Sequence, residues 1–331
     1  MRRVATIVAV TAVTAGLLAG CGGRQDAPRT DAGGAVTCEV KQDSRVGIAT
    51  GNATGVYFAL GNAYAEQVAQ ATDGTVKATA AETGASVQNI QQLVAGTYQV
   101  AFSLADTAAD AVLGTGGFDG KKQPVQALSR LYPNYTQVIV RNGANISSVA
   151  DLRGKRVSTG SPKSGTEVIA QRVLAAAGID PERDISAQRL DLTKTVDGMK
   201  DGSIDAMFFS GGLPTPGITD LFTSAGDKVR FLDIADLAPR LREVNPVYEA
   251  GKIPAATYGL PADAATIVVP NVLLVRDDLD ADLACVLTKT LFDRKQQLEQ
   301  ANSAAKGITR DTARETAPVP LHRGAEHALA N

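Results

Sequence analysis

Short apolar runs alternate with longer segments of helical periodicity along most of this sequence. Apolar strands are expected at 44–50, 75–81 and 99–103, and apolar positions recur at helical spacing through 57–72. A second helix is expected up to Val94, with Ser86 as its N-cap. This βαβαβ order predicts a mostly parallel sheet covered by helices on both faces, with a ligand site at the carboxyl ends of its strands.

The same order restarts in the second part of the chain. Strands are expected at 156–159, 187–190 and 204–209, helices at 166–177 and 194–200, and one long helix at 280–300. Two apolar stretches, 128–141 and 266–276, each contain a proline and are interpreted as crossings between lobes. We predict an α/β fold of two lobes, each a mostly parallel sheet flanked by helices, joined by these crossing strands. Lobe 1 is expected to comprise 44–138 plus 267–331, and lobe 2 to comprise 139–266.

The first 43 residues have the composition of a leader and a linker. Two arginines precede the apolar run 4–18, which is typical of a signal peptide. Leu18-Ala19-Gly20-Cys21 resembles the lipobox of bacterial lipoproteins, which predicts a signal peptide over 1–21 that ends at a lipidated Cys21. The alternative is an ordinary secretory signal with a chance cysteine. The polar, aperiodic stretch 22–43 is expected to be a flexible tether, so that the protein is exported and anchored by lipid to the outer face of the cytoplasmic membrane.

Export would leave two further cysteines in an oxidising compartment. Cys38 and Cys285 either form a disulfide between the end of the tether and a C-terminal helix, or remain two small unpaired apolar residues.

Composition narrows the classes of partner. The chain has 331 residues, of which 44% are hydrophobic, which is sufficient for two compact lobes. Its 33 Lys and Arg nearly balance its 35 Asp and Glu, so nucleic-acid binding is not expected.

Two turns rich in small residues, 50–57 and 158–166, each lead from a strand into a helix. Unpaired N–H groups and the positive dipole end of each helix favour an anion there. Gly51-x-x-x-Gly55 lacks the dinucleotide-binding spacing, and the second turn lacks the Gly-Lys-Ser/Thr of a P-loop, which argues against nucleotide binding. Side-chain donors that could complete a carboxylate site without an arginine are Thr50, Asn52, Thr54, Ser161, Ser164 and Thr166.

Catalytic and metal-binding patterns are weak. The sequence has no G-x-S-x-G elbow, and its two histidines, His322 and His327, are interpreted as a solvated helix start. We therefore expect no enzymatic activity, no metal and no cofactor. Tyr57, Tyr132, Tyr135 and Tyr258 fit either a ligand contact or core packing.

Four segments together resemble the TAXI family of solute-binding receptors. They are Thr50-Gly51-Asn52-Ala53-Thr54-Gly55-Val56-Tyr57, Glu82-Thr83-Gly84-Ala85-Ser86-Val87-Gln88-Asn89, Ser158-Thr159-Gly160-Ser161-Pro162-Lys163-Ser164-Gly165-Thr166 and Phe208-Phe209-Ser210-Gly211-Gly212-Leu213-Pro214-Thr215-Pro216. The resemblance implies the type II periplasmic binding protein fold and a receptor for a TRAP-type secondary transporter, which uses no ATP. It also implies a small carboxylate ligand: glutamate, glutamine, or a related dicarboxylate or oxoacid.

The resemblance also suggests which residues line the ligand. From lobe 1 these are Thr50, Gly51, Thr54, Gly55, Val56, Tyr57, Ser86 and Ser103, and from lobe 2 Ser161, Ser164, Gly165, Thr166, Ser210 and Gly211. The expected partners are a small carboxylate, a TRAP-type membrane permease and the membrane through Cys21, and the receptor is expected to be a monomer. The alternative function is a lipid-anchored sensor that signals ligand to a membrane partner without transport, and a hydrolase is a more distant third.

Overall fold

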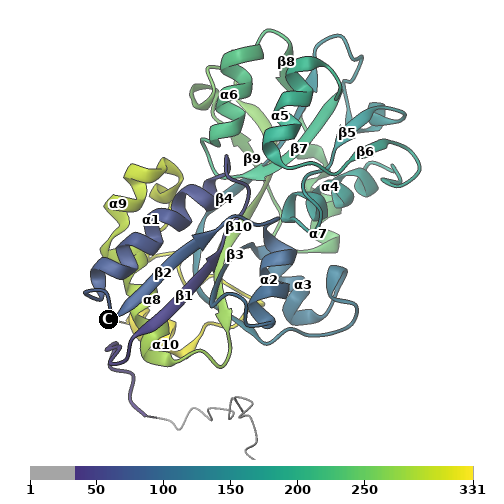
Figure 1. Cartoon of the computed structure of the whole chain (residues 1–331). Coiled ribbons are helices and arrows are strands. Elements are labelled where there is room, and N and C mark those ends of the chain that lie inside the picture. Colours follow the sequence, from purple (N-terminus) through teal and green to yellow (C-terminus); the bar gives the residue numbers. More distant parts are fainter. Residues whose placement is uncertain (1–33, 331) are drawn as a thin grey trace, which may run out of the picture.

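The computed structural model describes residues 34–330, and these form two lobes with two long strands between them (Figure 1). Lobe 1 is built on β1 (Ser44–Ala49), β2 (Val76–Ala81) and β3 (Val100–Leu104). The helices around this sheet are α1 (Val56–Ala71), α2 (Ser86–Val94) and α3 (Ala105–Leu113). β1 pairs in parallel with both β2 and β3, as the βαβαβ order requires.

Lobe 2 repeats this arrangement with shorter strands. Its strands are β5 (Arg156–Ser158), β6 (Ser186–Gln188), β7 (Ala206–Gly211) and β8 (Val229–Phe231), and its helices are α4 (Gly165–Ala176), α5 (Leu192–Asp201), α6 (Pro216–Ala225) and α7 (Ala238–Val244). β5 pairs in parallel with β6 and β7. Short 3₁₀ turns occur at Gly116–Phe118, Val149–Leu152, Ala235–Leu237, Ala255–Thr257 and Ser303–Gly307.

The two long strands join the lobes into one continuous sheet. β4 (Val125–Arg141) and β10 (Ala264–Arg276) are antiparallel, and the strand order is β2-β1-β3-β10-β4-β7-β5-β6. Pro133 lies opposite Pro270 in this pair, so each proline falls where the ladder already shifts register. β9 (Glu249–Ile253) pairs in antiparallel orientation with residues 264–268, the first part of β10. The α/β fold with a mixed sheet and flanking helices agrees with the sequence prediction.

The C-terminal helices cover lobe 1 and correct one expectation. Stretch 280–300 is not a single helix: α8 (Ala281–Asp293) ends at Arg294, whose φ of −111° and ψ of 21° break the helix before α9 (Lys295–Ala301). α10 (Arg323–Ala330) packs on α8. In Figure 1, α1, α8 and α9 lie on one face of the lobe 1 sheet, while α2 and α3 lie on the other.

The interpretation of His322 as part of a solvated helix start is wrong. The His322 side chain is buried, and Nε2 lies 3.0 Å from the carbonyl oxygen of Leu279 while Nδ1 accepts from the Gly324 N–H. It therefore joins the start of α10 to the loop before α8, which is a structural role.

The N-terminal segment meets lobe 1 at α8. The predicted signal peptide, the lipidated Cys21 and most of the predicted tether lie outside the described residues. Close to residue 34, the first that the structure describes, the backbone N–H groups of Thr37 and Cys38 both donate to Asp282 Oδ1, at 2.6 and 2.9 Å. Cys38 and Cys285 form a disulfide, with their Cα atoms 5.1 Å apart. This end of the tether is therefore fastened to lobe 1 and not free.

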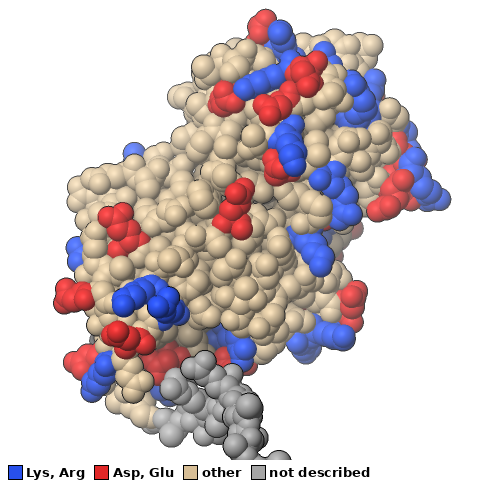
Figure 2. All heavy atoms as spheres, viewed as in Figure 1, with Lys and Arg blue, Asp and Glu red and all other residues tan. Residues whose placement is uncertain are grey.

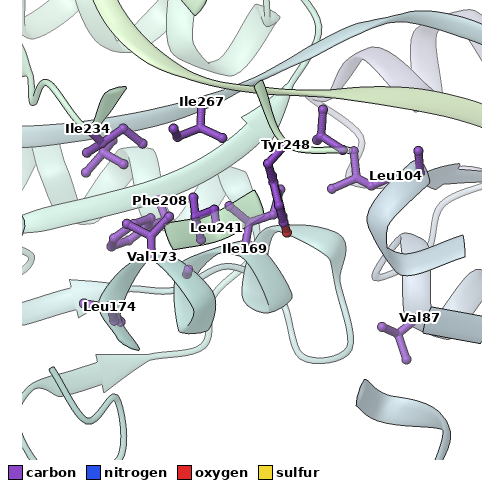
Figure 3. Close-up of a cluster of buried hydrophobic side chains, with 14 of the residues drawn as sticks. Val87, Leu104, Ile169, Val173, Leu174, Phe208, Ile234, Leu241, Tyr248 and Ile267 are labelled. Atoms are coloured by element: carbon purple, nitrogen blue, oxygen red, sulfur yellow. The ribbon is translucent and has the colours of Figure 1, made fainter. Parts of the chain in front are cut away.

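The lobes pack together through a continuous apolar cluster on the side of α3, α4 and α7. Leu104 of lobe 1 and Ile169, Leu241 and Tyr248 of lobe 2 belong to one buried cluster. Figure 3 shows the Tyr248 ring between Leu104 and the lobe 2 side chains. This contact holds the two lobes close together, and the site described below is enclosed as a result.

Candidate ligand-binding site

A small cavity lies between the lobes, at the carboxyl ends of the strands. Three helices begin at it: α1 at Val56, α2 at Ser86 and α4 at Gly165. The first N–H groups of a helix have no partner within that helix, and its dipole places partial positive charge there. The cavity therefore collects positive potential from both lobes and favours an anion.

The residues that line the cavity include no Asp, Glu, Lys, Arg or His, whereas such charged side chains are spread over the surface of both lobes (Figure 2). The lining residues are Gly51, Asn52, Gly55, Val56, Tyr57, Gly84, Ala85, Ser86, Leu104, Asn134, Ser164, Gly165, Thr166, Phe209, Ser210, Gly211 and Gly212. Its volume is about 40 Å³. The site is thus built for a small ligand held by backbone N–H groups and neutral side chains, with apolar contact from Val56, Leu104 and Phe209.

The lobes meet directly around the cavity. Asn52 Nδ2 donates to Ser161 Oγ over 3.2 Å, and the Gln88 N–H donates to the Lys163 carbonyl oxygen over 3.1 Å. On another side, the Gly217 N–H donates to the carbonyl oxygen of Thr54 over 3.1 Å. These bonds join segments of different lobes, so the structure represents a closed arrangement.

Most of the residues expected from the sequence come together at this cavity. Gly51, Gly55, Val56, Tyr57 and Ser86 line it from lobe 1, and Ser164, Gly165, Thr166, Ser210 and Gly211 line it from lobe 2.

Four expected residues do not line the cavity. Thr50 and Ser103 are fully buried, and their hydroxyls donate to backbone carbonyl oxygens, that of Thr50 to Ala81 on the neighbouring strand β2 and that of Ser103 to the adjacent Leu104. Thr54 and Ser161 lie at the contact between the lobes, Ser161 against Asn52 and Thr54 against Thr193, with 3.4 Å between the two threonine hydroxyls.

Ser86 has a different role from the expected one. The N-cap of α2 is Ala85, whose φ of 76° places an alanine in the left-handed region, and Ser86 is the first residue of the helix. Its hydroxyl accepts the Leu104 N–H over 3.1 Å. Because Leu104 is the N-cap residue of α3, Ser86 ties the starts of two helices together at the cavity wall.

Tyr57 presents a neutral hydroxyl beside the cavity. Its ring packs on Phe102 with the ring centroids 5.2 Å apart, and its hydroxyl donates to Asn271 Oδ1 on β10. Burial raises the pKa of Tyr57 well above its usual value, and the neighbouring Tyr132 and Asp106 act in the same direction. The side chain therefore stays protonated and links the site to one of the two crossing strands.

Several lining residues were not in the expected set. Leu104 directly follows the strand expected at 99–103, Asn134 lies in a stretch interpreted as a crossing between lobes, and Phe209 belongs to a segment quoted for the family resemblance, but none of the three was expected to line the ligand. Their position at the site depends on how the lobes approach each other, which periodicity does not encode. Other lining residues are marked in the sequence. The segments that carry the family resemblance contain Gly84, Ala85 and Gly212, and the first small-residue turn offers Asn52 as a side-chain donor.

Among residues 34–330, no group of three or more His, Cys, Asp or Glu side chains is arranged to hold a metal ion. None of the helices in the described part of the chain is both long and apolar enough to cross a membrane.

The fold is thus an α/β fold of two lobes with a mixed sheet and flanking helices, and the lobes enclose a cavity without charged side chains. The chain belongs to the NMT1-like family, whose model matches residues 48–330. Members of this family are substrate-binding proteins and not enzymes.

Solved structures with similar folds come from several bacteria. A structure from Bordetella bronchiseptica RB50 is 18% identical with a TM-score of 0.55, over 86% of this chain and 88% of that one, and it supports the fold. The alkanesulfonate-binding protein SsuA from Xanthomonas axonopodis pv. citri, bound to MOPS, is 16% identical with a TM-score of 0.48, over 88% and 85%. DctP7, a Bordetella pertussis extracytoplasmic solute receptor that binds pyroglutamic acid, is 14% identical with a TM-score of 0.46, over 86% and 92%.

Proposed function

We propose that this protein is an extracytoplasmic solute-binding receptor that captures a small carboxylate when its lobes close. The observation that carries this proposal is the meeting of three helix N-termini, from both lobes, at one cavity without charged side chains. Such a site can neutralise an anion only when both lobes are in place, because α1 and α2 belong to one lobe and α4 to the other.

The mechanism follows from this division. An anion first binds to the exposed starts of α1 and α2 in the open receptor. Closure then brings the start of α4 onto the ligand and excludes water, which strengthens the hydrogen bonds from both sides. Because the closed surface differs from the open one, a membrane partner can distinguish loaded from empty receptor. We take 44–138 plus 267–331 and 139–266 as the two moving bodies.

The finer assignment rests on the resemblance to the TAXI family. It makes the membrane partner a TRAP-type secondary transporter and the ligand a small dicarboxylate, oxoacid or related amino acid. The lipobox at Cys21 would keep the exported receptor at the outer face of the cytoplasmic membrane. A gene for a large multi-spanning permease beside this one would support the transport role, and a kinase or cyclase gene in its place would contradict it.

Binding is tested by isothermal titration calorimetry with acetate, glutarate, 2-oxoglutarate and L-glutamate. Saturable binding of at least one of them, weakened in Ser164→Ala, is the expected result. Ser164 caps α4 by accepting the Glu167 N–H over 2.9 Å, so its removal disturbs the lobe 2 half of the site. No binding of any of these anions by the folded protein would overturn the proposal.

A further inference from the structure

Three hydroxyl groups of lobe 2 line the cavity, and each already accepts a hydrogen bond from the protein. The Glu167 N–H donates to Ser164 Oγ over 2.9 Å, and the Ser210 N–H donates to Thr166 Oγ1 over 3.0 Å. The side-chain amide of Asn134 donates to Ser210 Oγ.

None of these three hydroxyl groups donates a hydrogen bond to another residue in the described part of the chain. A serine or threonine hydroxyl offers one donor and two lone pairs. In each of these three groups a lone pair is occupied by an N–H donor, while the described part of the chain provides no acceptor for the proton. A buried hydroxyl proton without an acceptor is unfavourable, and Ser164 and Thr166 are both buried, so a ligand that accepts hydrogen bonds would complete the site.

The carboxylates of Glu82 and Glu167 near the cavity form hydrogen bonds or an ion pair with other groups of the protein. Glu82 Oε1 accepts the Ala53 N–H over 3.0 Å. Glu167 accepts the Lys163 N–H over 2.7 Å through Oε2 and pairs with Arg189 through Oε1. Neither residue lines the cavity. The side-chain oxygen of Asn52, which does line it, accepts the Leu192 N–H over 3.3 Å.

We propose that the cavity, which has no carboxylate among its lining residues, binds a 2-oxo acid or a plain carboxylate in preference to the amino acid of the same skeleton. The α-ammonium group of an amino acid would lose its water on closure and find no carboxylate in the wall. An unpaired buried charge is strongly unfavourable, and the penalty corresponds to about a 10-fold to 100-fold difference in dissociation constant. This inference rests on the proposed function and adds its ligand class.

The experiment compares matched pairs by calorimetry with the full chain: pyruvate with L-alanine, 2-oxoisovalerate with L-valine, and 2-oxoglutarate with L-glutamate. Using three lengths removes any dependence on the size of the natural ligand. In every pair that binds, the oxo acid is expected to bind about 10-fold to 100-fold more tightly. Equal or tighter binding of the amino acid overturns the selectivity and leaves the receptor function intact. Absence of binding in all three pairs contradicts the receptor function as well.

Variants at Ser210 test the cause of the selectivity. Ser210→Ala removes one inward donor and is expected to weaken binding of the oxo acid about 10-fold while changing binding of the amino acid much less. Ser210→Asp adds an acceptor and is expected to reverse the preference. Ser224→Ala, on an exposed position of α6, is the matched control and should change neither. Equal loss for both ligands in Ser210→Ala would overturn the role of donor matching, and preserved far-ultraviolet circular dichroism excludes unfolding as the cause.

Discussion

Arg172 of lobe 2 donates to Asp106 of lobe 1, with 2.8 Å between Nη1 and Oδ2. The same guanidinium pairs with Asp110 through Nη2, and the Tyr248 hydroxyl donates to Asp106. Asp106 is fully buried, and only 14% of the Arg172 side chain is exposed. Two carboxylates and one guanidinium thus hold α3 against α4, next to the apolar cluster of Figure 3.

Replacing the arginine leaves two carboxylates buried without a counter-ion. We predict that Arg172→Met lowers the free energy of unfolding by about 3–5 kcal/mol at pH 7, the range found when one partner of a buried pair is removed. Chemical denaturation measures this. Arg183→Met is the control: its pair with Asp180 is largely exposed and is worth at most about 1 kcal/mol. A similar loss in both variants would contradict the role given to this cluster.

The pH dependence of the Arg172 variant follows from the same geometry. Burial raises the pKa of Asp106, and Arg172 opposes this shift. Without Arg172 the pKa of folded Asp106 lies still further above its unfolded value. Such a group contributes stability at low pH and loses it as the pH rises through its folded pKa. The deficit of Arg172→Met should therefore shrink between pH 7 and pH 5, and a constant deficit would contradict this account.

Asp151 gives the opposite pH dependence at an exposed site. It accepts hydrogen bonds from the N–H and hydroxyl groups of Ser147 and Ser148, and these bonds lower the pKa of Asp151 to about 2. A depressed carboxyl pKa stabilises the fold above the unfolded value of about 4, and the contribution is lost as the pH falls towards 2. Asp151→Asn should remove this component from the unfolding midpoint measured between pH 5 and pH 2, and an unchanged acid profile would argue against it.

The Cys38–Cys285 disulfide closes a loop of 247 positions in the sequence. A bridge of this span restricts the unfolded chain strongly, and we predict that the double variant Cys38→Ser with Cys285→Ser loses about 2–5 kcal/mol of stability. Reductant should lower the unfolding midpoint of the natural protein to that of the variant and leave the variant unaffected. A reductant effect on the variant itself would mean that the bridge is not the cause.

Much of the fold follows from the sequence because strands and helices alternate with clear periods. The βαβαβ order of lobe 1 and its restart in lobe 2 locate most strands to within a few residues. α3 was not expected, because the residues that it buries include Asp106, Thr107 and Asp110 and so do not form an apolar stripe. The break at Arg294 occurs without a proline or glycine at that position.

Part of the candidate site can also be predicted from the sequence, because local sequence marks where helices begin. Glycine turns mark helix starts, so Gly55 and Gly165 could be placed at the site before the structure was known. Whether a nearby hydroxyl lines the cavity depends instead on which partner it can reach. The Thr50 hydroxyl donates to the Ala81 carbonyl oxygen and that of Thr54 lies against Thr193, so neither lines the cavity. Ser164 and Thr166 do line it. Leu104 and Asn134 reach the site only through the relative placement of the lobes.

Gly165 offers a direct way to hinder closure. A Cβ atom at this position would lie 2.5 Å from Leu104 Cδ1 and 2.6 Å from Ser86 Oγ, both across the cleft in lobe 1. The backbone of Gly165 has no positive φ, so the helix itself accepts alanine. We predict that Gly165→Ala keeps its helix but weakens ligand binding about 10-fold or more, since the lobes cannot close fully. In the control Gly117→Ala the new atom lies 3.5 Å from Val87, an ordinary contact, and binding should be unchanged.

Ligand-driven closure is tested most directly by the distance between the lobes. Spin labels at Glu66→Cys on α1 and Ser224→Cys on α6, both exposed positions, report this distance by pulsed electron resonance. We predict that the carboxylate found to bind by calorimetry shortens the distance and narrows its distribution, and that Gly165→Ala retains the longer distance at the same ligand saturation. The same distribution with and without saturating ligand would contradict capture by closure.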